Sequence, residues 1–402
     1  MPQSDHLSGV LFSFHHLLES AAFRLRGGLL FSNLGVAMTK VNIRPAALEF
    51  DAAIDAVKDG KSLRDNLSAV AHVGRHLWLA SDETACIERL SAEDGLAFRN
   101  HKRFRLSDFV PLPQDDDGEA DLEAFAYGDN FLWVVGSHGF SREKPDQKSS
   151  EVKPEIKRLA QIDSNANRYT LARIPLVENQ GELELRESCP DPSAPWRTLT
   201  AAHLPFTKGG NALTDALSDD AHLGPFLSIP GKDNGFDIEG LAVSGARVFV
   251  GLRGPVLRGW AIILELEMEE TESRHLSLKK IGPKDRPFKK HFLQLDGLGI
   301  RDLLVHESDL LILAGPTMDL DGPVAVFRWK DGARAPSESL VPRDTLDKLF
   351  DVPYAYRADH AEGITLISKA GESPALLVVY DSPAGERKIG EHAVRADVFE
   401  LR

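Results

Sequence analysis

Cysteine and long apolar runs are both scarce in this chain. The 402 residues include only Cys86 and Cys189, so no disulfide framework is expected, and their spacing fits no zinc-binding pattern. A reducing compartment is the simplest inference, and we expect a cytoplasmic protein. No run of about 18 apolar residues exists, so no membrane-spanning segment and no membrane partner are expected.

Basic charge is also in the minority. Lysine and arginine total 47 against 61 aspartates and glutamates, which gives a formal net charge of −14. Nucleic-acid binding depends on cationic side chains that neutralise phosphates, so no nucleic-acid partner is expected. The motifs G-x-S-x-G, H-E-x-x-H, G-x-G-x-x-G and the P-loop are absent, so no motif assigns an enzyme class.

The first 37 residues differ from the rest of the chain. The apolar residues 9–12 are followed by His15 and His16, and no lysine or arginine precedes them, so a secretory signal is not expected. Two interpretations of residues 1–37 stay open: an extension that is helical or disordered, or an upstream start with Met38 as the true initiator. Residues 38–402 are predicted to form a single domain.

One strand–turn–strand unit recurs at least five times. Its copies share the consensus D-x-E-G-L-A, followed by a short polar turn and an apolar strand, which is the pattern of a β-hairpin. Antiparallel strands that recur about every 60 residues are typical of propeller blades, so we predict an all-β fold, a β-propeller. The copies begin at Asn66, Asp121, Asp237, Gly299 and His360.

The second and third copies lie about twice as far apart as most of the others. One explanation is a sixth, degenerate blade near residue 180, where residues 181–186 alternate as a strand does. The other is a small helical insertion near residues 205–228, because Asn211–Ser228 has apolar residues at helical spacing. We therefore predict five visible blades, with six possible. In the same gap, Ser141–Lys157 is charged and turn-rich and predicts an exposed loop.

The two ends of the chain are predicted to close the ring. The blade that begins at His360 is one strand short, because few residues follow it. Leu48–Phe50, which precedes the first copy, can supply that strand, and Ala396–Leu401 has the mixed character of an outer strand. Pairing both ends in one blade removes a free sheet edge.

Equivalent positions of the repeat are expected to converge on one site. The first strand of each blade lines the central channel, so the motif residues of all blades surround one axis. Several carboxylates in such a ring raise each other's pKa unless a cation lies between them. Arg253 and Arg301 can serve as that cation, and so can a hard metal such as Ca²⁺. The alternative is that each acid caps turns in its own blade and nothing binds.

The candidate site residues come mainly from three columns of the repeat. Outside the repeat motif, Arg253 and Arg258 can point together at a carboxylate or phosphate, or they can pair with local acids. The motif-glutamate column holds Ser68, Glu123, Glu239, Arg301 and Glu362. The predicted ligand-binding residues are Asp121, Glu123, His138, Asp237, Glu239, Arg253, Arg258, Arg301, His360 and Glu362. The predicted metal ligands are Asp121, Glu123, Asp237, Glu239 and Glu362.

Two stretches, Phe236–Ala242 and Gly251–Trp260, resemble the hallmark of the uncharacterised bacterial domain-of-unknown-function family 3616. The resemblance covers roughly residues 60–390. The E-G motif is also similar to that of esterase-like-phytase and calcium-binding lactonase propellers, which implies a cation-lined channel that acts on phosphate esters. Ser68 and Arg301 depart from an all-acidic ring, so the metal ligands do not carry over directly.

Three functions follow from these observations and stay open. The first is a propeller that binds a small ligand, with or without a metal ion, at its channel. The second is a metal-assisted hydrolase of phosphate or carboxylate esters. The third is a protein-interaction scaffold, because fold alone does not determine function.

Overall fold

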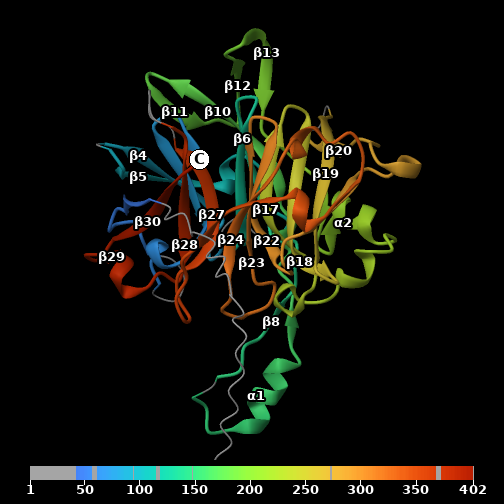
Figure 1. Cartoon of the computed structure of the whole chain (residues 1–402). Helices are drawn as coiled ribbons and strands as arrows, with labels where there is room; N and C mark the ends of the chain where they lie inside the picture. Colours follow the sequence, from blue (N-terminus) through green and yellow to red (C-terminus); the bar gives the residue numbers. More distant parts are fainter. Residues whose placement is uncertain are drawn as a thin grey trace, which may run out of the picture. The chain divides into compact units, whose positions relative to one another are not determined.

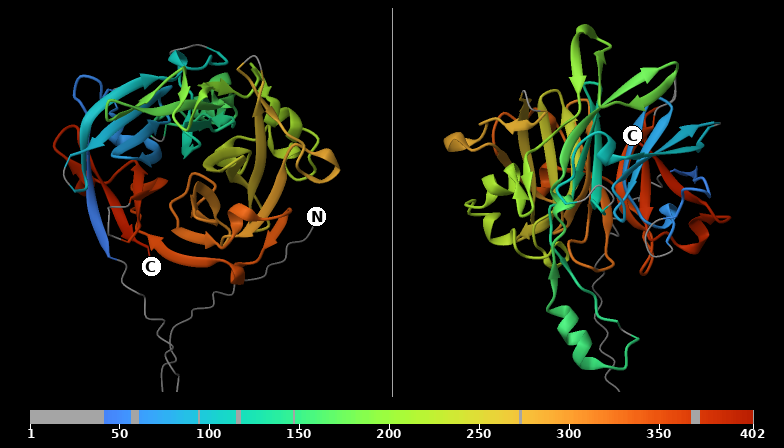
Figure 2. Two further views of the ribbon diagram at one scale, coloured as in Figure 1. Left: turned by 90° about the horizontal axis from the view of Figure 1, so that it is seen from above. Right: turned by 180° about the vertical axis from the view of Figure 1, so that it is seen from behind.

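The structure is a computed structural model that describes residues 42–56, 61–93, 95–114, 118–146, 148–271, 274–367 and 373–401. All of them belong to one unit, residues 41–402. The predicted N-terminal extension, residues 1–37, lies outside the described residues. The unit is built mainly of antiparallel sheets that are arranged around one axis, as Figure 2 shows from above, and it is a β-propeller. The all-β propeller prediction is confirmed.

Each copy of the repeat forms a first strand and a second strand that pair antiparallel. Both strands are rich in apolar residues that are buried, as expected where a sheet is covered on both faces. The first strands are β2 (Leu67–Val73), β6 (Leu122–Gly128), β17 (Asp237–Ser244), β22 (Gly299–His306) and β27 (His360–Ile367). The second strands are β3 (His76–Ser81), β7 (Phe131–Gly136), β18 (Arg247–Leu257), β23 (Asp309–Gly315) and β28 (Ala375–Asp381).

Third and fourth strands continue each pair outward. Apolar side chains between neighbouring sheets form the core; Trp78, Phe125 and Ile174, for example, belong to one buried cluster. The third strands are β4 (Cys86–Ala92), β10 (Leu171–Asn179), β19 (Trp260–Glu270), β24 (Val324–Trp329) and β30 (Ala393–Glu400). The fourth strands are β5 (Ala97–Arg105), β11 (Glu182–Leu185), β21 (Lys289–Gln294), β26 (Asp347–Val352) and β1 (Ile43–Glu49).

The two ends of the described chain lie in one sheet unit. β1 pairs antiparallel with β30, with Leu48 opposite Val394, and β30 pairs with β28. β1 also pairs in parallel with β5 through Ala47 and Ala97. The predicted ring closure is confirmed, and it protects the strand edges at the chain ends. The prediction of an outer strand at Ala396–Leu401 is wrong, because β30 lies between β28 and β1 and the outer position belongs to β1.

The long gap between the second and third copies does not contain a separate sheet at residues 181–186. β11 lies in the same sheet as β6, β7 and β10, which favours five blades, although the blade count stays a prediction. Asn211 caps helix α2 (Ala212–Leu217), which lies within the predicted helical insertion but is shorter than predicted. A hairpin and short strands complete this region and the ring: β12 (Ser188–Asp191), β13 (Ala194–Thr200), β14 (Ala202–His203), β15 (Phe206–Thr207), β16 (Gly210–Asn211), β20 (Leu276–Leu278), β25 (Ser339–Val341) and β29 (Lys388–Ile389).

The prediction of a plain exposed loop over Ser141–Lys157 is wrong in part. The segment contains strand β8 (Ser141–Arg142) and most of helix α1 (Val152–Leu159), and β9 (Ile162–Asp163) pairs with β8. Alanine-poor, charged helices of this length give a weak sequence signal, because isolated short helices are marginal in water. The helix is exposed and extends away from the sheets (Figure 1). No helix in the described ranges is long and apolar enough to span a membrane.

Every first strand carries a β-bulge at the same place in the motif. The pairing with the second strand shifts between Leu67 and Ala69, and at the equivalent positions of the other four first strands. A bulge leaves one residue unpaired and re-aims its side chain. The residues skipped by the pairing are Ser68, Glu123, Glu239, Arg301 and Glu362.

The residue after each bulge packs tightly against the next sheet. A β-carbon on Gly240 would lie 2.9 Å from Cγ of Leu303, which explains the glycine of the motif. Asp302 occupies the same position in β22. Its carboxylate accepts hydrogen bonds from the backbone N–H of Leu303 at 2.7 Å and of Ile364, in the adjacent sheet, at 2.8 Å. These contacts hold the bulges, and therefore the channel side chains, at fixed positions.

Candidate functional site

Two adjoining cavities occupy the region between the first strands. The first, called the arginine cavity, has a volume of about 640 Å³, and the second, called the acidic cavity, of about 460 Å³. The arginine cavity is lined by Arg253, Arg301, Tyr354, Tyr356, Arg357 and His360, among others. The acidic cavity is lined by Asp82, Asp121, Glu123, Arg168, Asp237 and Glu239, among others. Lys144, Lys232, Arg253, Asp319, Glu362 and Asp381 line both.

The five bulge residues all reach these cavities. Ser68, Glu123 and Glu239 line the acidic cavity, Arg301 lines the arginine cavity, and Glu362 lines both. The bulges therefore bring equivalent positions of five strands together, which is the convergence that the repeat predicts. Ser68 differs from the other four because its hydroxyl donates to the carbonyl oxygen of Leu122 at 2.6 Å and so links two first strands.

A chain of ion pairs connects three neighbouring sheets at the boundary between the cavities. Nε of Arg301, on β22, lies 3.0 Å from Oε2 of Glu239, on β17, and Nη2 of Arg301 contacts Glu362, on β27. Nη1 of Arg253 donates to Oε1 of Glu239 at 2.7 Å, and its Nε donates to the carbonyl oxygen of Thr317 at 2.9 Å. These buried charges are paired and hydrogen-bonded, as burial requires.

Burial shifts the pKa values of the groups in this series of ion pairs. Burial raises the pKa of Glu362 to about 7, because the opposing effect of Arg301 does not outweigh it. Burial and the neighbouring Glu239 raise the pKa of Asp237 to about 7 in the same way. Burial disfavours the charge of Arg253, but Glu239 and Asp237 outweigh it and hold the pKa of Arg253 above its usual value. The site therefore combines permanent cations with carboxyl groups that can take up a proton near neutral pH.

Glu123 is the least compensated acid of the site. Its carboxyl group has no hydrogen bond or ion pair among the described residues, and burial together with Asp121 and Glu239 raises its pKa well above the usual value. Burial and Asp121 also raise the pKa of Asp82, whose Oδ1 has no hydrogen-bond partner in the described part of the chain. The acidic cavity therefore contains carboxyl groups that have no cationic partner among the described residues, and a cation bound beside them would favour their ionised form.

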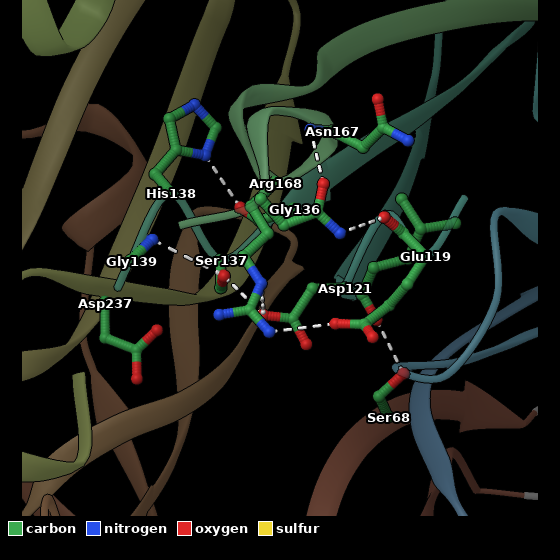
Figure 3. Close-up of polar contacts among 12 residues, drawn as sticks. Ser68, Glu119, Asp121, Gly136, Ser137, His138, Gly139, Asn167, Arg168 and Asp237 are labelled. Atoms are coloured by element: carbon green, nitrogen blue, oxygen red, sulfur yellow. Dashed lines mark hydrogen bonds and ion pairs between the residues drawn. The ribbon is translucent and has the colours of Figure 1, made fainter. Parts of the chain in front are cut away.

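Asp121, at one side of the acidic cavity, forms an ion pair with Arg168. Nε of Arg168 lies 3.1 Å from Oδ2 of Asp121, and its Nη2 donates to Oε1 of Glu119 at 2.8 Å (Figure 3). The hydroxyl of Ser137 donates to the same Oδ2 of Asp121 at 2.5 Å. Arg168 lies in the 3₁₀ helix η4 (Ala166–Tyr169), inside the long gap, where no repeat points to it. It is a site residue that sequence reasoning missed.

Most of the predicted ligand-binding residues line one of the cavities, but two do not. His138 is buried, with Nδ1 2.7 Å from the carbonyl oxygen of Gly136 and Nε2 2.6 Å from Nδ2 of Asn211, and burial lowers its pKa to about 4. Arg258 is exposed in the turn between β18 and β19. The residues brought together are Asp121, Glu123, Asp237, Glu239, Arg253, Arg301, His360 and Glu362.

The remaining site residues come from segments outside the repeat. Tyr354, Tyr356 and Arg357 lie on the loop before β27 and line the arginine cavity. Lys144 comes from the excursion that carries α1, and Lys232 from the segment before β17. Two exposed tyrosines in a short loop beside the last copy are the only sequence signal that points to any of them.

The predicted metal ligands are mostly engaged by arginines. Arg301 holds Glu239 and Glu362, and Arg168 holds Asp121. In the described part of the chain, no group of three or more His, Cys, Asp or Glu side chains is arranged to hold a metal ion. The calcium site stays a prediction.

Comparisons with known proteins place the chain in a family. Weak structural similarity is found to a PQQ-bound aldose sugar dehydrogenase of Streptomyces coelicolor, with 12% identity, 89% of this chain and 99% of that chain covered, and a TM-score of 0.34. A glutaminyl cyclase of Myxococcus xanthus gives 9% identity, 90% and 99% coverage, and a TM-score of 0.36. No curated protein matches. The model of the family described as protein of unknown function (DUF3616) matches residues 66–397, and the chain belongs to this family.

Proposed function

We propose that the chain binds a small polar ligand in the two adjoining cavities of its channel. The observation that carries the proposal is that five bulges direct side chains from five strands into these cavities. Bulges near a site re-aim side chains at the cost of a ladder hydrogen bond, and a purely structural ring does not need them at every first strand. A concave site with a few convergent polar groups is typical of small-molecule binding.

The chemistry of the lining supports a polar ligand rather than an apolar one. Arg253, Arg301 and Glu239 are more than nine-tenths buried and still border the cavities. Buried charged groups of this kind recognise ligands through charge-assisted hydrogen bonds, which are about twice as strong as neutral ones.

Thermal unfolding with a panel of small molecules tests this proposal. The panel contains neutral sugars, organic anions, organic amines and Ca²⁺. We expect at least one class to raise the melting temperature of the wild type and to have a smaller effect on Glu239→Gln. Asp129→Asn, in an exposed turn, is the matched control and is expected to respond as the wild type does. A panel that leaves the wild type unchanged would contradict the proposal.

Calcium is the metal that the acidic cavity would take, because hard cations prefer carboxylate oxygens. Among the predicted ligands, Glu123 makes no ion pair to a described residue, and Asp237 has only a long one, with Oδ2 3.8 Å from Nη1 of Arg253. If calcium binds, it raises the melting temperature, EDTA reverses the rise, and Glu123→Gln reduces it. Equal melting temperatures with calcium and with EDTA would remove calcium from the account.

A second candidate is hydrolysis of phosphate or carboxylate esters, favoured by the raised pKa values of Asp237 and Glu362 beside Arg253. A carboxyl group that titrates near neutral pH can accept a proton from water and return it to a leaving oxygen, while an arginine stabilises the developing anion. A screen of phosphomonoesters and lactones on the wild type and Glu362→Gln tests it. Equal turnover by both proteins would eliminate this role for Glu362.

We also propose a cytoplasmic location, which is supported by the free thiols of Cys86 and Cys189. Fractionation of cells that express the tagged full chain tests this proposal. Recovery of the chain outside the cytoplasmic fraction would contradict it.

A further inference from the structure

We propose that the arginine cavity binds the anionic group of a small organic ligand, a carboxylate or a phosphate monoester, between Arg253 and Arg301. The body of the ligand would lie against Tyr354 and Tyr356. This inference rests on the proposed function, because it names the class of ligand that the channel takes.

The two arginines still have hydrogen-bonding capacity directed at a ligand. Arg253 is 6% exposed and Arg301 8% exposed, and both line the cavity. Arg253 uses Nε and Nη1, and Arg301 uses Nε and Nη2, in the contacts to Thr317 and to the acids. Nη2 of Arg253 and Nη1 of Arg301 make no hydrogen bond to any described residue. A guanidinium held on one side by carboxylates is oriented for an anion on its other side.

The acids of the arginine cavity already have basic side chains as partners. Oδ2 of Asp319 lies 2.9 Å from Nζ of Lys144. His360 lies between Asp321, at 3.4 Å, and Asp381, at 3.7 Å, and hydrogen bonding to Asp381 contributes most to raising the pKa of His360. Glu362 is held by Arg301. Asp319 and Glu362 therefore each face a cation of their own, whereas Asp321 and Asp381 share one imidazole.

The charged groups without an ion-pair partner in this cavity are cations. Lys232 has no ion pair within the described ranges, and its side chain borders both cavities. The guanidinium of Arg357 makes no ion pair there either and lies 5.3 Å from the ring centroid of Tyr356. Both are exposed. Buried arginines below and exposed cations above favour an anion over a neutral or positive group.

The mouth of the cavity presents large apolar surface. Tyr354 is 47% exposed and Tyr356 79% exposed, on the loop before β27. Met318, 46% exposed, and Leu320, 61% exposed, also line the cavity from the loop after β23. Exposed aromatic and apolar side chains that border a charged pocket match a ligand with a ring or apolar body attached to its anionic group.

Isothermal titration calorimetry with four ring-bearing probes tests the inference. The probes are phenyl phosphate, benzoate, benzyl alcohol and benzylamine, which share a ring and differ in charge. We expect at least one anion to bind about tenfold more tightly than the alcohol and the amine, because one charge-assisted hydrogen bond accounts for that ratio. The tighter of the two anions identifies phosphate or carboxylate as the recognised group.

Variants locate the binding. Arg253→Gln is expected to lower the affinity for the anion by about tenfold, because it removes a charge at the base of the cavity. Arg395→Gln, at an exposed position of β30, is the control and is expected to bind as the wild type does. If Arg253→Gln fails to fold, Arg357→Gln replaces it, since that side chain is exposed; a loss of about threefold is expected. An unchanged affinity in Arg357→Gln and in any folded Arg253→Gln would overturn the inference.

The outcomes separate this inference from the proposed function. If benzyl alcohol or benzylamine binds at least as tightly as both anions, and Glu239→Gln weakens that binding, the anion inference is overturned and the channel is still a ligand site. If none of the four probes binds and the wider thermal panel also has no effect, both are overturned.

Discussion

The two cavities of the channel share one repeat but differ in the charge they leave unpaired. In the acidic cavity the charged groups without an ion pair include Glu123 and Asp82, both acids. In the arginine cavity they are Arg357 and Lys232, both cations, of which Lys232 also borders the acidic cavity. The comparison shows that one bulged strand, copied around a ring, can build two chemically different compartments when a single motif position changes from glutamate to arginine.

Arg301 is the residue at which the two compartments meet. It stands where the repeat has glutamate in three other copies, and it neutralises two of those glutamates, Glu239 and Glu362. A glutamate at this position would extend the acidic cavity around the ring. The arginine at this motif position therefore stabilises the neighbouring glutamates and gives the adjacent cavity a positive charge.

Among the variants proposed here, replacement of Arg301, where the two cavities meet, is expected to change the free energy of unfolding most. In Arg301→Met, Glu362, whose side chain is 12% exposed, loses its guanidinium partner. Removing one partner of a buried ion pair costs about 3–5 kcal/mol. We expect the free energy of unfolding, measured by urea titration at neutral pH, to fall by about 3 kcal/mol.

The double variant Arg301→Met, Glu362→Gln is the matched control, because it removes both charges of the pair. We expect it to recover about half of the lost stability. A double variant as unstable as the single one would show that Arg301 acts through packing and not through Glu362.

The titration of Asp237 is expected to make the stability of the folded chain depend on pH. Its pKa in the folded chain is about 7, above the value of about 4 in an unfolded chain. A raised carboxyl pKa contributes stability that is present below pH about 4 and lost as the pH rises to about 7, at about 1.4 kcal/mol per pH unit. Arg253, Glu239, Asp121 and Lys232 are the charged groups that influence it.

The measurement compares urea unfolding near pH 5 with unfolding near pH 8. Between these values the wild type is expected to lose about 2 kcal/mol more than Asp237→Asn does. Asp129→Asn, in an exposed turn, should retain the wild-type dependence. Parallel pH profiles of the wild type and Asp237→Asn would contradict the assignment.

Glu123→Gln is expected to stabilise the folded chain, by less than the Arg301 variant destabilises it. The amide has nearly the same shape and removes repulsion with Asp121 and Glu239. We expect a gain of about 1 kcal/mol near pH 8 and no change in anion affinity, because Glu123 lines the acidic cavity and not the arginine cavity. A loss of stability, measured in the same urea titrations, would mean that Glu123 has a partner that the account lacks.

Arg258→Gln is expected to have the smallest effect. The sequence places Arg258 with Arg253, but the structure leaves it exposed in the turn between β18 and β19, where its φ is 51°. We expect anion affinity to change by less than about twofold, as for exposed charges in general. A tenfold loss in calorimetry would restore the paired-arginine hypothesis.

The sequence predicted those features that repeat. Apolar strands and polar turns at a regular spacing are a direct consequence of sheet packing, so the copies from Asn66 to His360 reveal the propeller. Ring closure through β1 followed from a missing strand. Convergence of Glu123, Glu239 and Glu362 followed from equivalence around the axis.

The missed features depend on tertiary pairing or lie outside the repeat. A bulge is a mismatch between two strands, and the sequence of one strand does not specify it. Arg168 and Arg357 lie in irregular segments whose positions are set by contacts distant in sequence. His138 was included because its strand end was equivalent to that of Arg253, but Asn211 and Gly136 engage its ring away from the cavities.

A crystal of the full chain soaked in para-bromobenzoate shows directly where an aromatic carboxylate binds, because anomalous scattering from bromine locates the ligand. We expect a bromine peak at the mouth of the arginine cavity, beside Tyr356, with the carboxylate between Arg253 and Arg301. A peak in the acidic cavity, or only on the outer surface of the sheets, would contradict it.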